Sequence, residues 1–221
     1  MYGNIRRFLV FGLSGGAAEI VVMLVGPFVG LTVPLVAAQI LWINLLTHGL
    51  TGVAMGAEPG EPGAMSSPPR PPDQSVLGDG LWMRVLVTGS VLAAVTLGFG
   101  VWAHESDRAW QTMIFVALSS LQLGVALGLR PRQLALDNPT LLASIGGSLL
   151  LAVAGVYLSP LQTLLGTESL PAADLLLAIG IGMVGWVVVR LTRRPGRARS
   201  QGRRDPRPSA SAAGSGGATV E

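Results

Sequence analysis

The sequence has 221 residues, of which 50% are hydrophobic and only 12% are charged, and its mean hydropathy is +0.56. This profile is typical of a polytopic membrane protein and excludes an ordinary soluble domain. The formal net charge of +3 comes largely from the C-terminal tail and gives no reason to expect a nucleic-acid partner, while the absence of cysteine excludes disulfides and thiolate metal sites.

Two apolar segments open the chain. A short basic stretch at residues 1–7 precedes an apolar run at residues 8–28, which is long enough to span because about 20 residues cross the hydrocarbon core. Small and polar side chains interrupt this run at Ser14, Gly15, Gly16 and Glu19. After a tight connection, a second span is predicted at residues 35–54.

Four further apolar spans are predicted at residues 81–103, 110–129, 141–158 and 172–191, and the fourth span of the chain contains Gln122. A Pro- and Gly-rich loop at residues 58–80 and a connection of undefined shape at residues 161–171 separate them. Residues 193–221 are rich in Arg, Pro, Ser and Gly and bury too little apolar surface to order, so we expect a disordered cytoplasmic tail. The predicted fold class is all-α, a membrane helix bundle with about six transmembrane helices at residues 1–192.

The distribution of basic residues predicts the orientation in the membrane, because cytoplasmic loops carry an excess of Lys and Arg. With six spans, one side of the bilayer receives Arg6, Arg7, Arg70, Arg84, Arg130, Arg132 and the basic tail. The other side receives Arg108 together with Glu105, Asp107, Glu168 and Asp174. We therefore expect a multi-pass protein of the cell membrane, embedded in the lipid bilayer, with both termini in the cytoplasm.

The second span carries the most unusual polar residues. Asn44, Thr47 and His48 are spaced i, i+3 and i+4, so on a helix they share one face. Polar groups at bilayer depth normally face a bundle interior or a water-filled path. Gly49 and Gly52 weaken the helix that follows, and carbonyls freed there can bind a cation. The alternative interpretation is that these residues only form hydrogen bonds between packed helices.

Several segments contain unusual residues in a distinctive order. Q-I-L-W-I-N-L-L-T-H-G-L at residues 39–50, with G-A-E-P and M-S-S-P-P-R after it, resembles the sixth membrane helix of P-type cation-transporting ATPases and the following loop. Y-G-N-I-R-R-F at residues 2–8 resembles the stretch leading into the fifth helix, and L-Q-L-G-V-A-L at residues 121–127 resembles part of the eighth. The resemblance covers residues 2–192 and implies the last six of ten helices in a calcium-pump-like member.

The resemblance also implies a set of ion ligands. It places Glu19, Asn44, Thr47 and Gln122 at positions that bind the transported ion in the family, which agrees with the preference of hard cations for oxygen ligands. Gly16 stands where the family often has Asn, and His48 where it usually has Asp. Glu19 is then the one deep carboxylate, which argues against a two-ion calcium site. One divalent ion such as calcium, magnesium or manganese, a softer metal bound by the His48 imidazole, a proton-coupled role and no transport at all are the alternatives.

The motifs that the family uses for catalysis do not occur. The sequence lacks the phosphorylation motif D-K-T-G, the actuator loop T-G-E-S and the hinge G-D-G-x-N-D. We therefore expect no catalytic or cofactor-binding residues and no ATP hydrolysis by this chain alone. The predicted function is the cation-translocation part of a pump, as a fragment or a split or truncated form whose catalytic domains lie on a separate chain. A non-enzymatic regulatory or assembly protein, or an ATP-independent transporter, are the alternatives.

Overall fold

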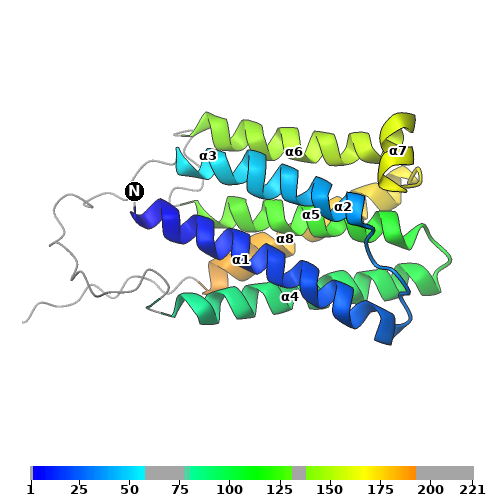
Figure 1. Cartoon of the computed structure of the whole chain (residues 1–221), viewed down its shortest axis with the longest axis horizontal. Helices are drawn as coiled ribbons and strands as arrows, with labels where there is room; N and C mark the ends of the chain where they lie inside the picture. The colour runs from blue at the N-terminus through cyan, green and yellow to red at the C-terminus, as the bar shows by residue number, and fades with distance from the viewer. Residues whose placement is uncertain (1, 58–77, 79, 131–137, 193–221) are drawn as a thin grey trace, which may run out of the picture.

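The structure is a bundle of helices. The computed structural model describes residues 2–57, 78, 80–130 and 138–192, and these residues form helices and connections without any strand (Figure 1). Five segments are long and apolar enough to cross a membrane: Gly3–Val29, Leu81–Glu105, Trp110–Leu129, Pro139–Tyr157 and Ala172–Thr192. The first comprises most of α1 (Tyr2–Val25) and the 3-10 helix η1 (Gly26–Val29), and the others are α4, α5, α6 and α8. The prediction of an all-α membrane helix bundle is confirmed.

The predicted second span is divided into three consecutive helical pieces. They are α2 (Ala37–Asn44), the π-helix η2 (Leu45–Thr51) and α3 (Gly52–Gly56). Together they form one broken rod at residues 37–56, which runs beside α1 and α6 (Figure 1). The helix remains continuous at Gly49, where the sequence predicted a loosened backbone, but its hydrogen bonds there follow the wider i→i+5 pattern of a π-helix.

Local sequence explains where several helices begin and end. α5 (Trp110–Leu129) stops before Arg130 because a residue that precedes proline, here Pro131, avoids the helical conformation. α6 (Pro139–Tyr157) begins at a proline, and Asn138 caps it by accepting a hydrogen bond from Leu141 N at 3.0 Å.

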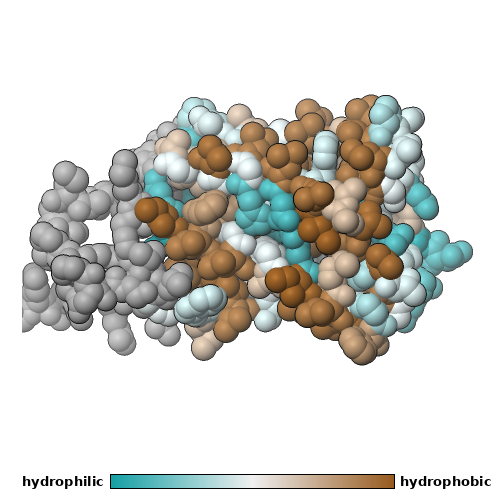
Figure 2. All heavy atoms as spheres, in the orientation of Figure 1, coloured by the Kyte–Doolittle hydropathy of each residue, from teal (hydrophilic) through white to brown (hydrophobic). Residues whose placement is uncertain are grey.

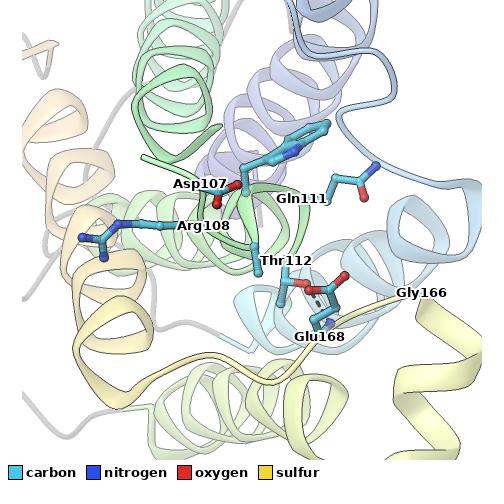
Figure 3. A pocket seen from close by; sticks show the side chains of 8 residues that line it. Asp107, Arg108, Gln111, Thr112, Gly166 and Glu168 are labelled. Atoms are coloured by element: carbon cyan, nitrogen blue, oxygen red, sulfur yellow. Dashed lines mark hydrogen bonds between the residues drawn. The ribbon is translucent and has the colours of Figure 1, made fainter. Parts of the chain in front are cut away.

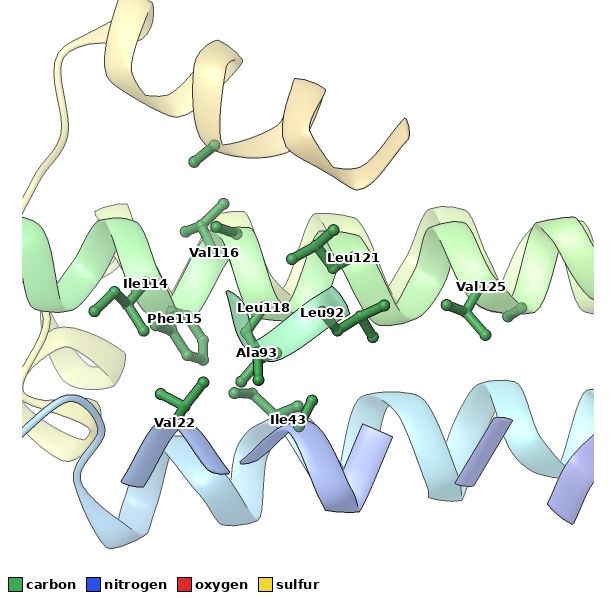
Figure 4. Close-up of a cluster of buried hydrophobic side chains, with 14 of the residues drawn as sticks. Val22, Ile43, Leu92, Ala93, Ile114, Phe115, Val116, Leu118, Leu121 and Val125 are labelled. Atoms are coloured by element: carbon green, nitrogen blue, oxygen red, sulfur yellow. The ribbon is translucent and has the colours of Figure 1, made fainter. Parts of the chain in front are cut away.

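Helix α5 forms the centre of the bundle. Most of its side chains are buried, whereas each of the other four long helices is largely exposed on its outer face. Figure 4 shows Phe115 and Leu118 of α5 pointing toward Val22 of α1 and Ile43 of α2, while Val116 points to the opposite side. A helix that is apolar all round belongs in an interior, so the sequence of α5 itself places it at the centre.

Glycines let α5 and α8 (Ala172–Thr192) pack backbone against backbone. A Cβ added to Gly124 of α5 would overlap the Gly182 carbonyl oxygen, and a Cβ added to Gly185 of α8 would overlap the Leu121 carbonyl oxygen. Close approach through small residues is the usual means by which membrane helices associate, since lipid offers no hydrophobic driving force between them.

The connection predicted at residues 161–171 contains a short helix. α7 (Ser159–Leu165) has Pro160 near its N-terminus and ends at Gly166, whose φ of +62° is a left-handed conformation that favours glycine. The following loop is tied to the end of α6, because Tyr157 Oη donates to the Leu170 carbonyl at 2.7 Å.

The two ends of the described chain lie at the same end of the bundle, while α7 and the turn between α4 (Leu81–Glu105) and α5 lie at the other (Figure 1). Arg108 in that turn forms an ion pair with Asp174 of α8. The predictions for the tail, for the basic loop at 131–137 and for most of the loop at 58–80 fall outside the described residues.

The α5–α8 packing predicts different outcomes for two glycines of the same helix. Gly185→Ala should lower the free energy of unfolding by about 1–3 kcal/mol, because its Cβ meets backbone that cannot move aside. Gly180→Ala is the matched control, since Gly180 is exposed and no atom lies within 4 Å of its added Cβ. Unfolding in detergent followed by circular dichroism measures both, and equal stability of the two variants would contradict the packing.

Candidate cation site

One face of α1 supports the predicted polar cluster. Gly12, Gly15 and Glu19 are spaced i, i+3 and i+7 and therefore lie along the same side of the helix. A Cβ on Gly12 would lie 3.2 Å from His48 Cδ2, and a Cβ on Gly15 would lie 2.8 Å from Gln122 Oε1. The two glycines thus leave room for polar side chains of η2 and α5 to reach the surface of α1.

Glu19 and Gln122 meet directly in the interior. Gln122 Nε2 donates to Glu19 Oε1 at 2.8 Å, and the two residues are only 6% and 1% exposed. A carboxylate can only accept hydrogen bonds, so this contact orients the amide and turns Gln122 Oε1 toward Gly15. That oxygen is buried and has no hydrogen-bond partner among the described residues. An unsatisfied buried acceptor costs about 1–3 kcal/mol, which a cation or a water molecule at this point would offset.

His48 joins the second span to α1. Its Nε2 lies 3.1 Å from the Gly12 carbonyl oxygen, and its Nδ1 lies 2.8 Å from Asn44 Oδ1. Because a carbonyl oxygen only accepts, Nε2 must carry a hydrogen, while Nδ1 is already taken up by the Asn44 side chain. The ring also packs against Phe11, with centroids 5.7 Å apart. His48 is therefore held in place by α1 as well as by its own helix.

Thr47 lies at the edge of the cluster. Its hydroxyl is fully buried and donates to the Ile43 carbonyl of the same helix at 2.8 Å, and its Oγ1 lies 3.3 Å from His48 Nδ1. The hydrogen of this hydroxyl is used within the helix, but the oxygen keeps a lone pair for another partner.

The structure brings the predicted residues together. Glu19 contacts Gln122, His48 contacts Asn44 and Thr47, and both groups meet α1 on the face that carries Gly12 and Gly15. Among the described residues, no three His, Cys, Asp or Glu side chains come together as a metal-binding group. A cation at this cluster would therefore depend on one carboxylate and several neutral oxygens.

The cluster is open on one side. Asn44, His48 and Gly16 are half-buried, and no atom lies within 4 Å of a Cβ added to Gly16. Figure 2 shows hydrophilic atoms in the middle of this face, where α1 meets the second span, surrounded by hydrophobic ones. Large apolar side chains beside it are strongly exposed, as for Ile20 at 62% and Leu41 at 71%.

A pocket at the far end of the bundle is separate from this cluster. It measures about 270 Å³ and is lined by the α4–α5 turn, the first residues of α5 and the loop after α7, including Asp107, Gln111, Thr112 and Glu168. Figure 3 shows Arg108 pointing away from the side chains of Thr112 and Glu168. Thr112 and Gln122 are ten residues apart on α5, or about 15 Å. The pocket therefore shares no residue with the cluster.

Sequence reasoning found the five side chains of the cluster but missed the residues that make room for them. The spacing of Gly12 and Gly15 ahead of Glu19 was the available signal. It identifies a glycine face, but not the side chains that approach it.

Comparisons with known proteins identify relatives along most of the chain. The family model described as cation transporting ATPase, C-terminus, matches residues 32–194. A calcium-transporting ATPase of Bacillus subtilis (strain 168) is 31% identical over 193 residues, which cover 83% of this chain and 22% of that protein. A calcium-transporting ATPase type 2C member 2 of Mus musculus is 31% identical over 204 residues, which cover 87% of this chain and 22% of that protein. The type 2C member 1 protein of Homo sapiens is 28% identical over 211 residues, or 91% of this chain and 23% of that protein.

The glycine face of α1 predicts that Gly15→Ala will separate Gln122 from Glu19. The added Cβ would lie 2.8 Å from Gln122 Oε1, so the amide must move, and we expect a loss of about 1–3 kcal/mol in stability. The side-chain amide resonance of Gln122 should shift with it. Gly16→Ala is the matched control, because its Cβ enters open space. An unchanged Gln122 resonance in Gly15→Ala would contradict the contact.

Proposed function

The chain belongs to the cation-transporting ATPases through their C-terminal membrane region, and from this we propose that it forms one side of a cation-translocation path. The chain spans about a fifth of the length of the curated relatives it matches. The observation that carries the proposal is the buried Glu19 carboxylate, which accepts a hydrogen bond from the Gln122 amide of α5 while the oxygen of that amide is left without a partner among the described residues.

The donor set suits one hard divalent cation. Glu19 would supply charge, and Gln122 Oε1, Asn44 Oδ1 and Thr47 Oγ1 would supply neutral oxygens. Calcium, magnesium and manganese all take oxygen ligands of these kinds. The unpartnered Gln122 oxygen supports this assignment, since a buried acceptor without a donor is the group that a cation satisfies best.

His48 limits the site to a single ion in this proposal. Its ring donates to the Gly12 carbonyl and faces the Asn44 oxygen, so it competes with a cation for that oxygen. A carboxylate at this position would add a ligand and a negative charge, whereas the imidazole adds neither in its present orientation. We propose that His48 leaves room for one cation at Glu19.

The open side of the cluster suggests that the site is completed from outside this sequence. Half-buried polar groups surrounded by exposed apolar side chains are costly against lipid, so further helices are expected to cover them. We propose that these helices and the ATP-hydrolysing domains are contributed by polypeptide beyond the 221 residues. The isolated chain is then no enzyme. Acid-stable labelling of it by radioactive ATP, reversed by hydroxylamine, would refute this point.

The hydrogen bonds of His48 favour a second candidate, a membrane scaffold that binds no ion. Both of its ring nitrogens already lie within 3.1 Å of protein oxygens. In that case the polar cluster only holds α1 against the second span, and the protein would serve as a regulatory or assembly partner. Direct ion binding separates the two candidates.

Ion binding should respond in opposite directions to two substitutions. Glu19→Gln should weaken binding of calcium or manganese by about tenfold or more, because it removes the carboxylate of the cluster. His48→Asp should strengthen it roughly tenfold, because it adds a second one. Isothermal titration of the full chain in lipid nanodiscs measures both, and Glu105→Gln is the control, since Glu105 is an exposed carboxylate at the end of α4. If Glu19→Gln changes nothing and His48→Asp does not tighten binding, the scaffold candidate is correct.

The charge distribution carries the proposed orientation, with both termini in the cytoplasm. The chain lacks cysteine, so single cysteines can report sidedness without background. In sealed right-side-out vesicles, an impermeant thiol reagent should label Asp107→Cys and spare Ser67→Cys. Equal labelling of the two positions from one side would contradict the orientation.

A further inference from the structure

The π-helix η2 is the one π-helical segment in the part of the chain that the structure describes, and it carries Thr47 and His48. A π-helical turn is less stable than an α-helical one and is usually found at functional sites. Something must therefore favour it over an ordinary α-helical turn at this position.

A serine from α6 contacts both ends of this turn. Ser148 Oγ donates to the Leu46 carbonyl at 2.9 Å, and Thr51 Oγ1 lies 3.2 Å from Ser148 Oγ. Ser148 and Thr51 are both fully buried. Ser148 contacts the side of the broken rod that faces α6, whereas His48 lies on the other side, against the glycines of α1. A single hydroxyl thus links two points of η2 from behind the cluster.

The spacing of these two points selects the π-helical form. Leu46 and Thr51 are i and i+5, the spacing that a π-helical backbone hydrogen bond joins. In an α-helix of 3.6 residues per turn, the same two residues lie about 140° apart around the axis. One small hydroxyl could not then reach both the Leu46 carbonyl and the Thr51 side chain.

The π-helical register also sets which residues face α1. Gly52 comes directly after η2, and a Cβ there would lie 2.8 Å from Phe8 Cε2 of α1. His48, within η2, bonds the Gly12 carbonyl of the same helix. If the same residues formed an α-helix, each turn would contain fewer residues. The segment that follows would then be rotated by about 100° around the helix axis. The contacts of His48 and Gly52 with α1 could not both survive.

We propose that Ser148 is a positioning residue for the cation site: with Thr51, it holds the π-helical turn that places Thr47 and His48 beside Asn44 and against the glycine face of α1 that also carries Glu19. This inference rests on the proposed cation-binding function for its consequence, but its structural part can be tested without any ion. Ser148 hydrogen-bonds Leu46 and Thr51, neither of which belongs to the polar cluster.

The structural part is tested by crosslinking α1 to α3. Phe8→Cys with Gly52→Cys places the only two thiols of the chain on facing positions, and a short bifunctional thiol reagent should join them. Adding Ser148→Ala should reduce the crosslinked fraction severalfold. Ser144→Ala is the matched control, because Ser144 is a buried serine one turn away on α6 whose hydroxyl donates to the Thr140 carbonyl of its own helix, at 2.8 Å.

The functional part is tested by titration with calcium or manganese in a chain without the introduced cysteines. Ser148→Ala should weaken binding about three- to tenfold, the range that the loss of one buried hydrogen bond covers. Thr51→Val, which keeps the shape but removes the hydroxyl, should weaken it in the same direction, whereas Thr51→Ser and Ser144→Ala should bind as the wild type does. Circular dichroism shows whether Ser148→Ala folds. If it does not, the affinity and the crosslinking of Thr51→Val test the inference in its place.

Reduced crosslinking together with weaker binding supports the inference. Unchanged crosslinking in both Ser148→Ala and Thr51→Val overturns it, and so does reduced crosslinking with unchanged affinity, since Ser148 would then hold the helix without positioning the ligands. If the wild type binds neither ion, the cation-binding function fails, and the crosslinking still reports whether Ser148 selects the π-helical turn.

Discussion

The burial of the Glu19 carboxylate is the constraint on which the rest of the structure depends. A carboxylate in an apolar bundle is stable only when hydrogen-bond donors or a cation compensate for the lost water. The chain meets this need with the Gln122 amide of the most buried helix, and His48 of the broken helix packs beside it on the same face of α1. Their side chains reach α1 because it presents hydrogen atoms instead of side chains at Gly12 and Gly15. The contacts that pack the three membrane segments together are thus the same contacts that form the polar cluster.

Hydropathy and helix-end signals predicted the bundle because they act locally. The bounds of α5 were predicted at residues 110–129, and those of α8 differed by one residue, since a polar turn or a proline limits each apolar run. The same signals failed at α7 (Ser159–Leu165), where a helix too short to span is hidden in an apolar connection. They also failed to divide the second span, because the choice between α- and π-helical hydrogen bonds depends on partners far away in the sequence.

The cluster was predictable in part. The spacing of Asn44, Thr47 and His48 identified a polar face from the sequence alone. Glu19 and Gln122 lie 103 positions apart, and no local pattern joins them, so their pairing required the family resemblance. The role of Gly12 and Gly15, which leave space for these side chains, could not be identified from the sequence alone. Whether the space beside a glycine is used depends on the side chain that packs opposite it. Such positions become visible only when the helices are placed together.

Paramagnetic broadening by manganese tests most directly whether a cation binds between Glu19 and Gln122. Mn²⁺ added to the full chain in nanodiscs should broaden the side-chain amide resonance of Gln122 at concentrations that leave Gln162 of α7 unaffected, since Gln162 lies at the far end of the bundle. Equal broadening of the two amides, or broadening confined to exposed carboxylates such as Glu168, would contradict the claim.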